Sequence, residues 1–125
     1  MAKLLASALL ALLLLLGSGR PAWAGPVNWQ ELPASDQGQQ WWDSGSLRNT
    51  KDGYISVLSR FLPATKEGEK PRMGDLYVME IDCGQQLYRD TSVNGLPQFG
   101  AQWLPAAGDS LINGVIEASC AALPA

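Results

Sequence analysis

The sequence predicts an α+β domain, in which an antiparallel sheet is covered on one face by a single C-terminal helix. Three observations support this fold class. Between residues 27 and 103, segments that alternate apolar and polar residues are separated by turn residues, as in a sheet of paired strands. After Pro105 the apolar residues follow helical spacing instead. One cysteine lies in each region, Cys83 among the strands and Cys120 in the helix.

The expected strands are short alternating or apolar segments bounded by glycine, proline or polar turn residues. They span residues 27–32, 41–43, 47–49, 54–62, 76–83, 86–90 and 96–103. Gly45 lies between the second and third segments and indicates a bulge or kink there. Asp52-Gly53 and Asn94-Gly95 are typical of two-residue hairpin turns, because these residues adopt positive φ at low cost. Residues 63–74 carry two prolines and charges of both signs, and we expect a long solvated loop there rather than a docking site.

The strand at residues 76–83 shows the clearest alternation. Its inward face carries Tyr77, Met79, Ile81 and Cys83, and its outward face carries Glu80 and Asp82. Cys83 is therefore expected to face the core. Pro97 cannot donate a ladder hydrogen bond, so the last strand is expected at a sheet edge.

The C-terminal helix is predicted from apolar or small residues spaced three or four apart. They are Ile112, Val115, Ile116, Ser119, Cys120 and Leu123. Asp109 or Ser110 can cap the first turn, and Gly114 should destabilise the helix by about 1 kcal/mol relative to alanine. The cysteine belongs to the helix face that packs on the sheet.

Residues 1–24 are typical of a cleaved signal peptide. A lysine near the start is followed by an apolar stretch at residues 4–16, and Ala22-Trp23-Ala24 has small residues where signal peptidase reads them. We expect cleavage between Ala24 and Gly25, which leaves a single domain at residues 25–125. The alternative is a retained membrane anchor, but the apolar stretch is too short for the roughly 30 Å hydrocarbon core.

The remaining chain is acidic. It has seven basic and twelve acidic residues and a net charge of −5, because Lys3 and Arg20 leave with the signal peptide. Phosphate backbones and anionic lipid surfaces repel such a chain on average. We therefore expect neither a nucleic acid partner nor a stable membrane anchor after cleavage.

Export to an oxidising compartment predicts a disulfide between Cys83 and Cys120, joining strand to helix. In the chain-entropy model such a bridge destabilises the unfolded chain by roughly 4 kcal/mol. The alternative is a pair of free thiols with redox or metal duties, which neither their spacing nor any histidine supports.

The common catalytic machineries are not encoded here. The sequence has no histidine, no Gly-x-Gly-x-x-Gly motif and no phosphate-binding loop. We expect no enzyme activity, no catalytic residue, no metal and no cofactor. A hydrolase that uses Glu80 and Asp82 as a carboxylate pair is the remaining catalytic alternative, and solvation explains these side chains more simply.

Four tryptophans in residues 25–125 suggest a binding surface. Trp41 and Trp42 must point to opposite faces if both lie on a strand. Buried packing explains them most simply, and a partner-binding anchor is the functional hypothesis, because tryptophan is enriched at binding hot spots. Tyr88 and Arg89 are further candidates for that surface.

Several motifs together resemble the surface-adhesin protein E-like domain family. They are Asp43-Ser44-Gly45-Ser46-Leu47 after an aromatic pair, residues 77–83 followed by Tyr88-Arg89, Trp103-Leu104-Pro105 before Gly108-Asp109-Ser110, and Cys120. The resemblance implies a curved antiparallel sheet of about six strands that is disulfide-linked to its C-terminal helix. It also implies kinship with a dimeric, lipid-anchored surface adhesin of Gram-negative bacteria that binds laminin, vitronectin and plasminogen.

The lipid-bearing cysteine and the basic binding segments of that adhesin have no counterpart here, so no binding residue is carried over. The sequence predicts an exported, non-enzymatic module that binds a protein partner or a second copy of itself. Its location would be the periplasm, another lumen reached by secretion, or the exterior. The alternative is a periplasmic or lumenal accessory or stability factor with no adhesin role.

Overall fold

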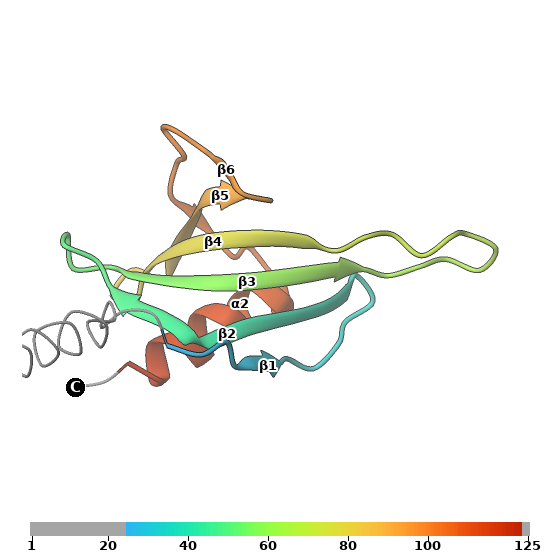
Figure 1. Cartoon of the computed structure of the whole chain (residues 1–125), viewed down its shortest axis with the longest axis horizontal. Coiled ribbons are helices and arrows are strands. Elements are labelled where there is room, and N and C mark those ends of the chain that lie inside the picture. Colours follow the sequence, from blue (N-terminus) through green and yellow to red (C-terminus); the bar gives the residue numbers. More distant parts are fainter. Residues whose placement is uncertain (1–24, 124–125) are drawn as a thin grey trace, which may run out of the picture.

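The computed structural model describes residues 25–123 and contains one antiparallel sheet with a helix on one of its faces (Figure 1). The strands are β1 (Trp29–Glu31), β2 (Gly38–Asn49), β3 (Ile55–Pro63), β4 (Asp75–Asp82), β5 (Leu87–Val93), β6 (Leu96–Pro97) and β7 (Leu104–Pro105), and the helix is α2 (Ser110–Ala121). Neighbouring strands pair in sequence order from β1 to β6, and β7 also pairs with β5. This confirms the predicted α+β class. The expected signal peptide at residues 1–24 lies outside the described residues.

The core lies between α2 and the sheet. Its buried side chains are Trp42, Ile55, Val57, Met79 and Ile81 from the strands and Leu111, Val115 and Ile116 from the helix. The helix packs mainly on β2 and β3. Asp109 is its N-cap, because its Oδ1 accepts from the backbone N–H groups of Leu111 and Ile112. In residues 25–123, no helix has the length and apolar character needed to cross a membrane.

The disulfide joins Cys83, directly after β4, to Cys120 in the last turn of α2, as predicted. The two Cα atoms are 5.8 Å apart. Gly114 lies where the helix meets the chain after β1. A side-chain methyl group at this position would come within 3.1 Å of a methyl group of Leu32. Glycine at this position has a low helix propensity, but its lack of a side chain lets the helix approach Leu32 closely.

The bulge predicted near Gly45 is present in β2. The register with β3 shifts between Asp43 and Arg48. The buried carboxylate of Asp43 accepts hydrogen bonds from the backbone N–H groups of Asn28 at 2.7 Å and Gly45 at 2.9 Å. The N-terminal segment is therefore tied to the bulge.

Two turn predictions had different outcomes. Asn94 and Gly95 have φ values of 50° and 81° and connect β5 to β6 as a two-residue turn, as predicted. The prediction of a two-residue turn at Asp52-Gly53 is wrong, because residues 50–54 separate β2 from β3. The hydroxyl of Thr50 accepts from the N–H of Tyr54 at 3.1 Å and so stabilises this wider loop.

The expected strand at residues 96–103 is also wrong in extent. Only Leu96–Pro97 and Leu104–Pro105 pair with β5. The Gln98 N–H still donates to the Thr91 carbonyl of β5 at 2.9 Å, and the chain leaves the sheet after it. Pro97 has no N–H to continue the ladder, and Gly100 turns the chain at a φ of 74°. The predicted loop after β3 is confirmed: residues 64–73 are exposed, and the connection to β4 projects beyond the sheet in Figure 1.

Candidate functional site

No helix within residues 25–123 covers the sheet face opposite α2, and we call this face the open face. Side chains alternate along each strand, so Trp42 faces the helix and Trp41 faces the other way. The strand register places Trp41 opposite Arg60 and Leu58 opposite Val78 on the open face. This face therefore presents aromatic, aliphatic and cationic side chains together.

The first feature of the open face is a cation–π pair. The guanidinium carbon of Arg60 lies 5.3 Å from the centre of the Trp41 ring. Arg60 is exposed, and no carboxylate within residues 25–123 forms a salt bridge with it. A contact of this kind contributes about 0.5–1 kcal/mol at an exposed site. The charge of Arg60 thus remains available to a partner.

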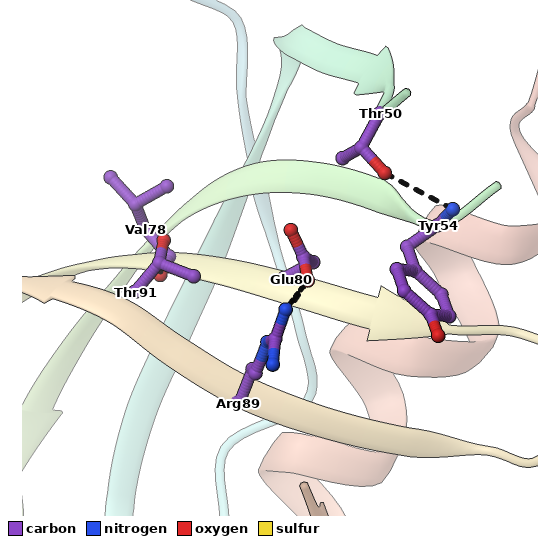
Figure 2. A network of polar contacts seen from close by, with 6 residues as sticks. All are labelled: Thr50, Tyr54, Val78, Glu80, Arg89 and Thr91. Carbon is purple, nitrogen blue, oxygen red and sulfur yellow. Dashed lines mark hydrogen bonds and ion pairs between the residues drawn. The ribbon is translucent and has the colours of Figure 1, made fainter. Parts of the chain in front are cut away.

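The second feature is a cluster around Arg89 of β5. Its Nε donates to Glu80 Oε1 of β4 at 2.9 Å, and its Nη2 forms an ion pair with the same oxygen. Figure 2 shows the two side chains pointing toward one another from neighbouring strands. The guanidinium carbon also lies 4.3 Å from the Trp103 ring centre, and that ring is 4.7 Å from the ring of Tyr54. Arg89 is therefore fixed by a carboxylate and an aromatic face together.

A groove of about 350 Å³ adjoins this cluster. Its walls are Arg89 and Thr91 of β5 and residues 97–101, the segment that leaves the sheet. The side chain of Phe99 is 94% exposed in that segment. A large apolar side chain this exposed is a candidate contact for a partner.

Sequence reasoning missed the groove because it assigned residues 96–103 to a strand. The signal that could have revealed it is the pair Phe99-Gly100, a bulky apolar residue beside a glycine in a segment that already contains Pro97. It also missed Arg60. The alternation of β3 places Arg60 on the face opposite Val57 and Phe61, and could have indicated it.

The four candidate partner-binding residues do not form one surface. Trp41 and Arg89 lie on the open face. Trp42 is 8% exposed and belongs to the core. Tyr88 lies on the helix-covered face and lines a pocket there, where burial and the charges of Asp90 and Asp109 raise the pKa of its hydroxyl. The structure thus leaves Trp41 and Arg89 as the two candidates on the open face, and their binding role remains a prediction.

The carboxylates considered for catalysis both have structural partners. Glu80 is paired with Arg89, and Asp82 Oδ1 accepts from the backbone N–H of Gln85 at 3.2 Å. Within residues 25–123, no group of three or more acidic, cysteine or histidine side chains is arranged to hold a metal ion.

Comparison with known proteins gives one match. Searches of the curated proteins and of the solved structures found no match to this chain. A family model described as the surface adhesin-E family matches residues 30–125, which include every strand pairing from β2 onward, both cysteines and α2. Membership of such a family, together with the disulfide, indicates an exported protein with an adhesin-like character. The chain therefore belongs to the surface adhesin-E family.

Proposed function

We propose that this protein is an exported, non-enzymatic module whose open face binds a protein partner. The observation that supports the proposal is the presence of two arginine–tryptophan contacts on the open face, Arg60 with Trp41 and Arg89 with Trp103. Tryptophan and arginine are among the residue types most enriched at binding hot spots. Family membership supports the same reading.

The chemistry of the open face specifies the partner. Leu58, Leu76 and Val78 surround the Arg60 contact on β3 and β4, and Leu76 is exposed. Arg60 supplies a cation that no side chain within residues 25–123 neutralises by a salt bridge. The complementary surface is an apolar patch of a protein bordered by a carboxylate.

A double variant tests this surface. Trp41→Ala with Arg60→Ala removes one apolar ring and one cation from the open face. Met73→Ala with Lys66→Ala removes one apolar side chain and one cation from the exposed loop between β3 and β4, and serves as the control. Quantitative capture from the exported fraction, followed by titration of the captured protein, should show binding by wild type and control and loss of binding by the open-face variant.

Equal binding by both double variants would overturn the proposal. Sedimentation of the purified chain tests whether the open face instead binds a second copy of the chain. If the wild-type chain associates with itself and the open-face variant does not, the open face binds a second copy of this chain. That result would contradict the proposal that it binds a different protein.

The second candidate function is that of an accessory factor of the cell envelope without an adhesin role. The net charge of −5 over residues 25–125 favours it, because acidic surfaces are repelled by anionic cell surfaces. Antibody labelling of intact and permeabilised cells discriminates between the two. Labelling of intact cells supports binding at the surface, and labelling that requires permeabilisation supports the accessory role.

A further inference from the structure

The helix-covered face contains a pocket of about 200 Å³ near the beginning of α2. Tyr77 and Met79 of β4 and Tyr88 of β5 line it from the sheet, and Ile112 lines it from the helix. It is smaller than the roughly 300–1,000 Å³ of a pocket for a whole drug-sized ligand. Its size suits a side chain or a small organic group.

Two carboxylates line this pocket, and no lysine or arginine does. Asp109 is already engaged, because its Oδ1 accepts two backbone N–H groups at 3.0 Å each at the start of the helix. Asp90 differs. Its carboxylate is half-buried, and the salt bridge found within residues 25–123 joins other residues. Burial raises the pKa of Asp90, with no opposite charge to offset the effect.

A neutral acceptor belongs to the same pocket lining. Gln40 is 4% exposed, and its Nε2 donates to Ser59 Oγ at 2.8 Å. That bond leaves the amide oxygen of Gln40 as an acceptor, and no donor within residues 25–123 bonds to it. This oxygen is not fully enclosed, because the fully buried side-chain polar atom that lacks a partner in residues 25–123 is Ser119 Oγ. A water molecule or a ligand in the pocket can therefore donate to the Gln40 oxygen.

The two tyrosines add aromatic faces and neutral hydroxyls. Burial, followed by the charges of Asp75 and Asp90, raises the pKa of Tyr77. The pKa of Tyr88 is raised by burial and by Asp90 and Asp109. Both hydroxyls therefore stay protonated at neutral pH, and the pocket combines one negative charge without a partner with two electron-rich rings.

We infer that this pocket binds the ammonium group of a primary alkylamine, with Asp90 as its counter-ion. A primary ammonium has three N–H donors, which matches the carboxylate of Asp90, the amide oxygen of Gln40 and a tyrosine hydroxyl. Tyr77 and Tyr88 line the pocket, and an aromatic ring attracts a cation that lies over its face. Met79 and Ile112 supply an apolar wall for its alkyl stem. The amine belongs to a lysine side chain of another protein or to a free small amine.

NMR titration of the purified full chain tests the inference. The probes are butylamine hydrochloride and N-acetyl-lysine methylamide, each with a neutral counterpart, butanol and N-acetyl-norleucine methylamide. We expect the amines to shift the amide resonances of β4, β5 and the first turn of α2, and the neutral compounds to leave them unchanged. Tighter binding of the lysine derivative identifies a protein lysine as the source, and tighter binding of butylamine identifies a free amine. Equal shifts from neutral and charged probes, or no shift from either amine, would overturn the inference.

Two variants of equal charge complete the test. Asp90→Asn should weaken amine binding roughly ten- to a hundredfold, because a hydrogen bond to a charged group is lost. Asp52→Asn changes the net charge equally on an exposed turn and should bind as wild type does. Far-ultraviolet circular dichroism confirms that both variants fold. Unchanged amine affinity in folded Asp90→Asn protein would contradict the assigned counter-ion.

Discussion

Trp41 and Trp42 are adjacent in sequence, yet their side chains have different roles. Trp42 is 8% exposed and packs with Val57 and Met79 in the core. Trp42→Ala should therefore lower the free energy of unfolding by about 3–5 kcal/mol, as expected when a large aromatic side chain is removed from a core. Trp41→Ala should cost roughly 1 kcal/mol, since Trp41 is half-buried on the open face. Urea unfolding followed by circular dichroism measures both, and equal losses would contradict the assignment of faces.

The contrast shows what a sequence can predict about single residues. Alternation along a strand predicted that the two rings point to opposite faces. It did not predict which ring is buried, because both neighbours of the pair, Gln40 and Asp43, are polar and both are buried in the structure. Burial of those residues depends on contacts with Ser59 and with the N-terminal segment, which are distant in sequence.

Gly45 lies at a position where the neighbouring backbone leaves no room for a side chain. A side-chain methyl group at this position would overlap the carbonyl oxygen of Pro26 and approach Asp43 Oδ1 within 3.2 Å. The obstructing atom belongs to the backbone, so the segment before β1 would have to move away. Gly45→Ala should therefore lower the free energy of unfolding by about 1–3 kcal/mol, the usual cost of overpacking.

Gly84→Ala is the matched control for Gly45→Ala. A methyl group at Gly84 meets one atom, Asp82 Oδ1, at an ordinary contact distance of 3.5 Å. Urea midpoints measure the two effects. Limited proteolysis should also cut the segment before β1 faster in the Gly45 variant alone, and equal cleavage of both variants would sink this explanation.

Asp90 predicts a pH dependence of stability. Because its pKa is raised in the folded protein, ionisation of Asp90 destabilises the fold once the pH exceeds the unfolded value. Asp90→Asn should then be more stable than wild type at neutral pH, and this advantage should vanish as the pH falls below about 4, the ordinary value of an aspartate. The charged or titratable side chains that line the pocket with Asp90 are Tyr77, Tyr88 and Asp109. The pKa values of Tyr77 and Tyr88 are raised above their ordinary value near 10, so both hydroxyls stay neutral throughout this pH range. Thermal melts at neutral and acidic pH measure the difference, and an advantage independent of pH would contradict it.

Among the structural elements, α2 depends on its covalent link to the sheet. The disulfide closes a separation of 37 residues between the end of β4 and the last turn of the helix. Replacing both cysteines by serine should lower the free energy of unfolding by about 2–5 kcal/mol. Wild-type protein kept reduced should match the double variant in urea midpoint. A midpoint that reduction leaves unchanged would show that the helix is held by packing alone.

Elements formed by interactions between residues close in sequence were easier to predict than elements that depend on distant residues. Strands β3 and β4 and the helix were predicted because long runs of alternation or helical spacing encode them locally. Strand β2 (Gly38–Asn49) was predicted only as two short pieces, residues 41–43 and 47–49, because the polar residues 38–40 and the bulge near Gly45 interrupt its pattern. The segment 98–103 was not, because its departure from the sheet depends on the two short pairings of β6 and β7 with β5. The groove beside Arg89 was missed for the same reason, although Phe99-Gly100 after Pro97 marks a break in the strand pattern.

In the whole molecule, one sheet separates the two proposed sites. Trp41 and Arg60 lie on the open face, whereas Asp90 lines the pocket on the face that α2 covers. Sites that share no contacts usually contribute independently to binding and stability. We therefore expect Trp41→Ala with Arg60→Ala to abolish capture of the protein partner while leaving amine affinity unchanged. Asp90→Asn should have the opposite pattern.

A variant that combines Trp41→Ala, Arg60→Ala and Asp90→Asn tests whether the two faces are coupled. Its loss in each assay should equal the loss in the corresponding single-face variant within roughly 0.5 kcal/mol, the usual limit of additivity. A larger discrepancy would mean that the strands transmit a change from one face to the other. Arg89 and Asp90 are consecutive residues of β5 with side chains on opposite faces, so β5 is the element through which such coupling would pass. Arg89→Lys keeps the charge but loses the paired contact with Glu80 and Trp103. If the faces are coupled, this variant should change amine affinity. If they are independent, amine affinity should stay unchanged.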